Sequence, residues 1–196
     1  MKTITGKARK QAIIIEAIGV INEFGIQAMS TKEIAKRQKI SEATIFKYFN
    51  TKNELIDAVI DQYSRLDPII MDAAKANSNS PIEAITYSVE KLAEYYEESP
   101  GLIAIAGAYD VLLCMPEFAL KIRSIFDCRS SFIKAEIEEA KRLGLINSKA
   151  DSKDLTDIIL GTFLRVSLEW KMCKYGFSLK KQLKSLLNII LEAFKA

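Results

Sequence analysis

The sequence predicts an all-α fold of about nine helices. Apolar residues repeat at helical spacing through most of the chain, and strand-type alternation bounded by hairpin turns is absent. Helix-start signals also recur, in which a serine or threonine is followed three residues later by glutamate. They are Ser30-x-x-Glu33, Thr51-x-x-Glu54 and Ser80-Pro81-x-Glu83.

The first helix is expected over about residues 7 to 24. Ile14, Ile18 and Ile21 would share its buried face, and Gly25 would end it at the C′ position, where glycine adopts positive φ easily. Ser30 would then open a short second helix that turns Ile34 and Ala35 inward.

A second short helix follows closely. The two helices, roughly residues 31 to 37 and 42 to 49, are joined by about four residues around Lys39, which are the dimensions of a helix-turn-helix. Ser41 would cap the second of them, and Ile45 and Phe49 would hold its buried side.

Further helices are predicted from the same signals. Thr51 opens a long helix that Pro68 should kink or end, and the polar stretch Lys75 to Ser80 is the best linker candidate. Later starts and stops are Ser80-Pro81, Ser99-Pro100, Pro116 to Leu143 with Gly144 as the stop, Asp151 or Ser152 to Gly176, and Ser178.

Charge is unevenly divided along the chain. Residues 1–52 hold ten Lys or Arg against four Glu, a net charge of +6, whereas residues 53–196 hold 18 against 21, a net charge of −3. Such asymmetry suggests an N-terminal module that faces a polyanion. We therefore divide the chain into an N-terminal helix-turn-helix domain, 1–52, and a C-terminal helical domain, 53–196.

Several functional classes are disfavoured. Charged residues interrupt every apolar stretch well before the roughly 18 residues that a bilayer requires, and the first 30 residues lack a secretory pattern, so we expect a cytoplasmic protein without a membrane partner. Cys114, Cys128 and Cys173 are widely spaced and are expected to be buried reduced thiols. Without histidine or a phosphate-binding loop, neither a metal, a cofactor nor an enzyme activity is expected.

The segment from Ala35 to Phe49 (AKRQKISEATIFKYF), followed by Thr51-Lys52-x-Glu54-Leu55, resembles the TetR family of bacterial transcriptional regulators. The resemblance covers about residues 10 to 60. It implies an N-terminal three-helix helix-turn-helix domain, a C-terminal helical domain for dimerisation and ligand binding, and double-stranded operator DNA as a partner.

Carried over by position, the resemblance implies two kinds of DNA contact. Thr31, Thr44, Tyr48 and Lys52 match the family's phosphate contacts, and Glu42, Ala43, Phe46 and Lys47 match its base-facing positions, with Ser41 at the cap. Elementary chemistry agrees, because hydroxyls and helix N-termini suit phosphate oxygens and lysine can reach guanine N7 or O6.

Three positions affect whether the operator preferences of the family apply to this chain. Lys39 stands where a glycine usually permits positive φ, and Phe46 replaces a tyrosine and loses its hydroxyl. Glu42 can accept a hydrogen bond from cytosine N4 but repels phosphates. The operator preferences of the family should therefore not be copied to this chain.

The last two helices carry wide apolar stripes, for which two interpretations remain open. The stripes could simply pack on the core of the monomer, or they could form a four-helix bundle between two subunits, as the resemblance implies. We favour a homodimer, because helix-turn-helix proteins generally need two half-sites. The expected interface residues are Ile159, Val166, Leu183, Leu187, Ile190 and Leu191.

Aromatic residues between residues 81 and 170 suggest a pocket for a small, largely apolar ligand, although aromatic residues at helical spacing usually just pack in the core. The candidate ligand contacts are Tyr87, Tyr109, Phe126 and Phe163. A buried Arg123 or Arg129 could pair with an acidic ligand, or either could be a surface residue.

The leading hypothesis is a sequence-specific DNA-binding transcriptional regulator, a repressor released by its ligand. A second is a helical dimeric adaptor that binds protein in place of DNA, which an exposed apolar groove would favour. The third is an enzyme built on a helical bundle, which carboxylates clustered around a metal would favour.

Overall fold

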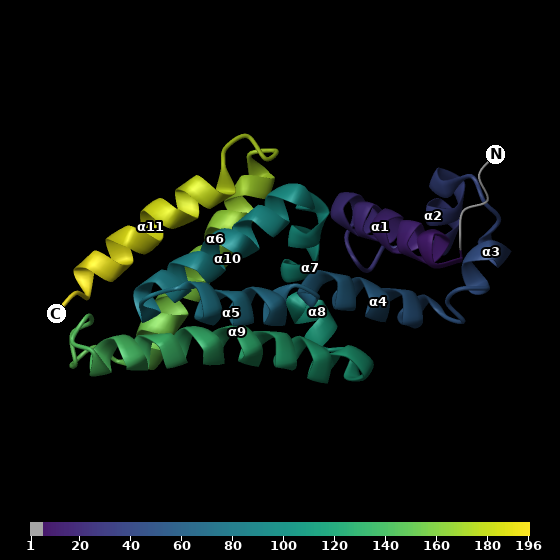
Figure 1. The fold of residues 1–196 in the computed structure, drawn as a ribbon. Helices are drawn as coiled ribbons and strands as arrows, with labels where there is room; N and C mark the ends of the chain where they lie inside the picture. The colour runs from purple at the N-terminus through teal and green to yellow at the C-terminus, as the bar shows by residue number, and fades with distance from the viewer. Residues whose placement is uncertain (1–5) are drawn as a thin grey trace. The chain divides into compact units, whose positions relative to one another are not determined.

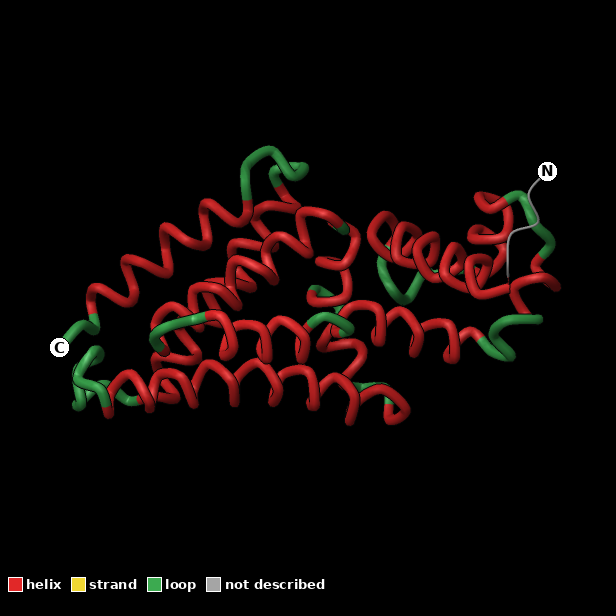
Figure 2. The backbone as a smooth tube through the Cα atoms, viewed as in Figure 1, coloured by secondary structure: helices red, strands yellow, loops and turns green. Residues whose placement is uncertain are grey.

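The computed structural model describes residues 6–196, which form helices α1 to α11 and one short 3-10 helix (Figure 1). No strand is present in this range (Figure 2). Ile146 and Lys195 form an isolated antiparallel bridge. The predicted all-α fold is confirmed. Residues 1–5, which include Lys2 of the predicted N-terminal domain, lie outside the described residues.

The chain divides into two compact units. The first runs through Ser64 and adds Gly101–Ile122, and the second comprises Arg65–Pro100 and Arg123–Ala196. The helix after residue 52 therefore packs within the first unit. The domain boundary drawn at residue 52 stays a prediction about which residues make up the DNA-binding part.

Four helices begin the first unit: α1 (Gly6–Phe24), α2 (Thr31–Gln38), α3 (Glu42–Phe46) and α4 (Lys52–Ser64). Gly25 follows α1 with φ of 85°, as its position after the helix predicted. The core beneath these helices is aliphatic, with Ile13, Ile34 and Ile45 all fully buried. Apolar burial of this kind is the main force that holds such short helices together.

The predicted caps of these helices form. The Ser30 hydroxyl accepts a hydrogen bond from the Glu33 N–H at 3.4 Å, and the Ser41 hydroxyl accepts one from the Thr44 N–H at 3.2 Å. Thr51 accepts from the Glu54 N–H at 3.1 Å. Each cap satisfies one N–H group that has no partner inside its helix and thereby fixes where the helix begins.

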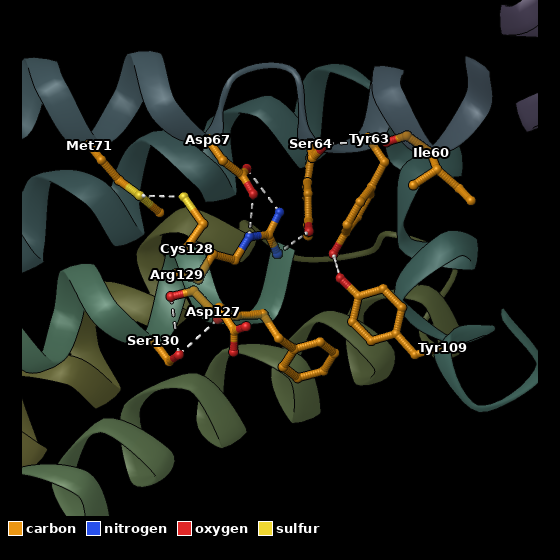
Figure 3. Close-up of polar contacts among 12 residues, drawn as sticks. Ile60, Tyr63, Ser64, Asp67, Met71, Tyr109, Asp127, Cys128, Arg129 and Ser130 are labelled. Carbon is orange, nitrogen blue, oxygen red and sulfur yellow. Dashed lines mark hydrogen bonds and ion pairs between the residues drawn. The ribbon is translucent and has the colours of Figure 1, made fainter. Parts of the chain in front are cut away.

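The first unit is completed by α7 (Ile103–Ala106), α8 (Tyr109–Leu113) and the first turns of α9 (Pro116–Arg142), which follow the 3-10 helix Pro100–Leu102. A Cβ atom at Gly101 would lie 2.8 Å from Ile18 Cγ2, so only glycine allows this close approach to α1. The Tyr109 hydroxyl donates to the Tyr63 hydroxyl at 2.6 Å (Figure 3).

Polar contacts join α4 to the start of α9 along one face of each helix. Asn53 donates to Glu117 at 2.6 Å, and Lys121 pairs with Asp57 at 2.5 Å and with Asp61 at 2.7 Å. Partial burial lowers the pKa of Lys121, but its two carboxylate partners outweigh this and raise the pKa above its ordinary value. The spacing of four residues on both helices keeps these partners in line.

The second unit contains α5 (Asp67–Asn77), α6 (Pro81–Glu98), the rest of α9, α10 (Ser152–Met172) and α11 (Leu179–Ala193). α6 lies beside both α5 and α11. The break between α4 and α5 confirms that the long helix ends near Pro68. The predicted linker is shorter than expected, because α5 continues to Asn77.

The end of α10 also differs from the prediction. α10 stops at Met172, before Gly176, and the non-glycine residues Lys174 and Tyr175 adopt positive φ values of 50° and 63°. The Tyr175 N–H donates to the Trp170 carbonyl at 2.8 Å, which satisfies a carbonyl of the last turn. Glycine was therefore a misleading stop signal at this position.

A buried ion pair lies inside the second unit (Figure 3). The Arg129 guanidinium donates to both carboxylate oxygens of Asp67, at 2.7 and 3.0 Å, and to the Tyr96 hydroxyl at 3.1 Å. Burial raises the pKa of Asp67, and the Arg129 charge partly offsets this. Removing either partner would leave a buried unpaired charge, at a cost of about 3–5 kcal/mol.

The three cysteines are exposed, so the prediction of buried thiols is wrong. Each lies near the end of a helix or on its outer side: Cys114 follows α8, Cys128 is on α9 and Cys173 follows α10. Burial was expected because free cysteine is among the most often buried residue types, but that average does not fix which side of a helix a particular cysteine occupies.

Candidate nucleic-acid interface

α2, the following turn and α3 form the predicted helix-turn-helix. Ile45 and Phe49 are 0% and 1% exposed, which confirms that this side of the second helix is its anchor. α3 is shorter than predicted, because it ends at Phe46 and Lys47 and Tyr48 lie in the turn that follows. The outward side chains are thus presented by one and a half turns of helix and the turn after it.

The residues assigned to DNA by resemblance have outward positions in the first unit. The exposed ones are Ser41, Glu42, Ala43, Phe46, Lys47 and Lys52. The half-buried ones are Thr31, Thr44 and Tyr48. Half-burial suits phosphate contacts, because a side chain whose base is packed in the protein presents its hydroxyl in a fixed position.

Hydrogen bonds join several of these residues to each other. The Thr31 hydroxyl donates to the Glu42 carboxylate, which links the first turn of α2 to the first turn of α3. The hydroxyls of Ser41 and Thr44 lie 2.8 Å apart and share a hydrogen bond. Thr31 must therefore exchange the Glu42 carboxylate for a phosphate oxygen if it is to contact DNA.

Lys39 adopts the left-handed conformation, with φ of 53° and ψ of 44°, as its position in the turn predicted. The Lys39 and Ile40 N–H groups donate to the carbonyls of Lys36 and Ala35 at 3.2 and 3.0 Å, which closes the end of α2. A lysine in this conformation carries a backbone strain of about 1 kcal/mol relative to glycine. In return it places an exposed cation beside the helix-turn-helix.

Acidic residues of α1 and α2 gather around one arginine. Arg37 pairs with Glu33 at 2.9 Å, with Glu23 at 2.6 Å and with Glu16 at 3.8 Å. The hydrogen bond from Arg37 lowers the pKa of Glu33 below its ordinary value. Three of the four glutamates in residues 1–52 are therefore held together around one cation, and Glu42 alone of the four belongs to α3.

The start of α1 adds cations that the assignment by resemblance left out. α1 has no acidic residue in its first turn and carries Lys7, Arg9 and Lys10 there, although the helix dipole disfavours cations at that end. The Lys10 ammonium lies 4.9 Å from the centre of the Phe49 ring, directly after α3. These cations thus lie close to the segment that follows α3, at a helix end where the dipole does not favour them.

Residues 13–59 match the family of bacterial regulatory proteins, tetR family, and the match spans the whole helix-turn-helix and the first half of α4. This N-terminal region is therefore similar to that family. The fold is that of a TetR-type DNA-binding regulator.

Curated relatives that this chain is similar to are nucleoid occlusion factors named SlmA. The protein from Haemophilus ducreyi is 26% identical over 122 residues, which cover 62% of this chain and 60% of that protein. The protein from Actinobacillus pleuropneumoniae serotype 5b is 26% identical over 168 residues, 82% of this chain and 81% of that protein. The chain thus spans less than two thirds of the Haemophilus protein.

The fold is also that of solved TetR-type structures. The ketosteroid transcriptional regulator KstR2 of Mycobacterium tuberculosis superposes with a TM-score of 0.86, and the match covers 100% of both chains at 16% sequence identity. At this level of identity the likeness establishes the fold of both units and says nothing about a ligand.

Most of the expected interface residues are buried within the second unit, and their part in a dimer stays a prediction. Ile159, Val166, Leu183 and Leu187 are 2–5% exposed and pack inside the second unit of the chain itself, and Leu191 is 9% exposed. Ile190 is half-buried. The outward faces of α10 and α11 instead present Ile158, Met172 and Ile189, which are 42%, 81% and 63% exposed.

The four aromatic residues expected at a ligand lie in different surroundings. Phe163 packs edge-on against Tyr96 and lines a cavity of about 10 Å³, which has room for about one water molecule. Phe126 is 44% exposed, Tyr87 is half-buried, and Tyr109 belongs to the first unit. Arg129 is occupied by Asp67, and Arg123 is exposed.

Within residues 6–196, no helix has the length and apolar character to cross a membrane. No group of three or more Cys, Asp or Glu side chains in the described part of the chain is arranged to hold a metal ion.

Proposed function

We propose that the protein is a sequence-specific transcriptional regulator that binds operator DNA as a homodimer in the cytoplasm and represses until a small molecule releases it. The observation that carries the proposal is the division of α3 and the turn after it into a buried and an outward side. Ile45 and Phe49 anchor it, while Glu42, Phe46 and Lys47 point outward beside a cationic surface. A helix held in this way presents its first turns to the major groove.

Selection of bound DNA from a random pool tests the proposal and returns the operator in the same experiment. We expect enrichment of one palindromic sequence by the wild type. The matched control is Lys134→Ala, a lysine on the part of α9 in the second unit, which should select the same sequence. Recovery of no sequence preference would favour the alternative, a helical dimeric adaptor that binds protein.

The homodimer is proposed to form through the outward faces of α10 and α11. Ile158, Met172 and Ile189 are large apolar side chains exposed on these faces. Gly161 lies on the same side of α10, and a Cβ atom there would meet nothing within 4 Å. A partner helix could therefore approach closely at Gly161. The dimer would then hold together two reading heads, the helix-turn-helix segments of its two subunits.

A nucleoid occlusion factor is the second candidate, since the SlmA relatives carry that name and align over both units. The two functions predict different distributions on the chromosome. A transcriptional regulator should occupy few sites next to the genes whose expression changes on deletion. A nucleoid occlusion factor should occupy many sites spread along the chromosome, with cell division altered on deletion. Mapping bound sites in cells distinguishes the two.

We also propose that a small, largely apolar ligand binds between residues 81 and 170 and releases the protein from operator DNA. Such binding requires space that the cavity beside Phe163 does not offer. The cavity beside Phe163 holds about 10 Å³, so a drug-sized ligand needs side chains there to move. To lower operator affinity 100-fold, the ligand must favour the non-binding state by about 2.7 kcal/mol. Operator binding measured across a panel of apolar metabolites tests this.

A further inference from the structure

A second candidate site lies inside the first unit, apart from the aromatic residues discussed above. An open groove of about 620 Å³ lies among the loop after α1, the start of α4 and the region of α8. This volume lies within the range of small-molecule sites, which is about 300–1,000 Å³. Its lining residues are Ile26, Gln27, Lys52, Asn53, Ile56, Asp110, Val111, Cys114 and Met115.

Most of the groove is apolar. Ile26 and Ile56 are 6% and 3% exposed and form part of its floor, and Val111 and Met115 are half-buried beside them. Apolar surface of this kind gains free energy when a ligand body displaces water from it.

The groove also holds two opposite charges, which are both exposed. Lys52 and Asp110 form no ion pair with each other or with any other residue in the range 6–196. The Asn53 amide, by contrast, is already bonded to Glu117. An ammonium and a carboxylate left without ionic partners beside an apolar floor complement a ligand that carries both charges on an apolar body.

We propose that this groove binds a small apolar zwitterion, with its carboxylate at Lys52 and its ammonium at Asp110. A dipeptide of two apolar amino acids has this chemistry and fits the volume. If the proposed DNA-binding function holds, the ligand also competes with DNA directly, because Lys52 is a candidate phosphate contact. This mechanism requires no change in the separation of two reading heads.

Binding is measured on the full chain without DNA, so that it does not depend on the proposed function. The probe is leucyl-phenylalanine, and its matched controls are the N-acetyl form, which lacks the ammonium, and the C-terminal amide, which lacks the carboxylate. We expect each control to bind about tenfold more weakly by calorimetry, which corresponds to about 1.4 kcal/mol. Equal affinity of all three compounds would overturn the proposal.

Two variants test which residue of the groove pairs with each charge of the dipeptide. Asp110→Asn should remove the preference over the N-acetyl form and keep the preference over the amide, and Lys52→Met should do the reverse. Both residues are exposed, so neither variant is expected to disturb the fold. If both variants lower the affinity of all three compounds equally, the charges do not recognise the ligand and the proposal is wrong.

Cys114 provides a direct map of the site, because it lines the groove and is exposed. The dipeptide should slow alkylation of Cys114 and leave alkylation of Cys173, an exposed cysteine of the second unit, unchanged. Equal rates at Cys114 with and without saturating dipeptide would place the ligand elsewhere. Operator binding in the presence of the dipeptide is measured separately, so a failure of DNA recognition is distinguishable from a failure of this site.

Discussion

At Lys39, a charged side chain occupies a backbone conformation that glycine adopts more easily. The strain and the charge act in opposite directions, since strain lowers stability and an exposed cation favours contact with phosphate. Replacing Lys39 and measuring stability and DNA binding separately distinguishes the effect of the strain from the effect of the charge.

Lys39→Gly is expected to raise the free energy of unfolding by about 1 kcal/mol, because glycine removes the strain of positive φ. Urea denaturation measures this change. Lys36→Gly is the matched control, since Lys36 lies inside α2, where glycine should cost about 1 kcal/mol. The interpretation is wrong if both variants are destabilised alike. Lys39→Gly should at the same time weaken DNA binding at low salt.

Lys47 and Lys52 are expected to contact different parts of the DNA, Lys47 the bases and Lys52 the phosphates. Lys52→Ala should weaken binding to all sequences alike and reduce the salt slope by about one, because it removes a proposed phosphate contact. Lys47→Ala should instead relax the preference at particular base pairs, at a cost of about 1–3 kcal/mol for the preferred base. Binding titrations over a set of single-base operator variants measure both effects. Identical behaviour of the two variants would contradict these roles.

At the level of single residues, local signals were predictable and distant partners were not. The caps at Ser30 and Ser41 and the positive φ of Lys39 depend on neighbours within a few residues, which the sequence displays directly. The pairing of Arg37 with Glu23 joins two different helices. No spacing rule within one helix reveals such a contact, because it depends on how the helices pack.

At the level of helices, the sequence shows the apolar stripes on α10 and α11, but it does not show which surfaces they pack against. Leu187 packs within the second unit while Ile189, two residues away, is 63% exposed. A wide apolar stripe can pack against two neighbouring helices. The sequence pattern is the same whether both neighbours belong to the same chain or one belongs to a partner subunit. The expected interface residues therefore included side chains that the monomer already uses.

Leu187 and Ile189 now offer a matched pair on α11. Leu187→Glu is expected to unfold the second unit, because a charge buried without a partner costs several kcal/mol out of a total stability of about 5–15 kcal/mol. Ile189→Glu should keep the fold and produce monomers. Circular dichroism reports the first outcome and light scattering the second. A folded Ile189→Glu dimer, or a monomeric wild type, would exclude the proposed interface.

α6 and α11 are also joined by ion pairs that should make stability depend on pH. Lys180 pairs with Glu94 at 2.5 Å and with Glu90 at 3.4 Å. The hydrogen bonds from Lys180 and then Lys91 lower the pKa of Glu94 below its ordinary 4.5. The stabilisation is therefore present above about pH 4.5 and is lost as the pH falls through the lowered pKa of the folded protein.

Lys180→Met should make the unfolding midpoint less dependent on pH in this acidic range, because it removes the interaction that favours the charged carboxylates. Thermal unfolding measured across the range checks the prediction. Lys153→Met is the control: it removes the same charge from an exposed pair with Asp157, which should contribute little. A similar flattening in both variants would show that net charge, and not the contact between α6 and α11, sets the pH dependence.

At the level of the whole molecule, two identical heads are expected to read a palindrome with half-sites about 34 Å apart. If each subunit neutralises about four phosphates, the dimer neutralises about eight, and the slope of log K against log salt should be near −7. Fluorescence anisotropy at several salt concentrations measures the slope. A slope near −3 to −4 would indicate that one subunit binds alone.

On the proposed function, the grouping of Glu16 and Glu23 around Arg37 affects how fast the protein finds DNA. Lys7 and Glu23 are 16 residues apart on α1, which is about 24 Å along the helix axis. Cations at one end and surplus carboxylates at the other give the first unit an electric dipole moment. The negative field of a duplex exerts a torque on that dipole before any contact forms. On the proposed function, we therefore expect the molecule to approach with α3 foremost, so that a larger share of its diffusional encounters begins in the productive orientation.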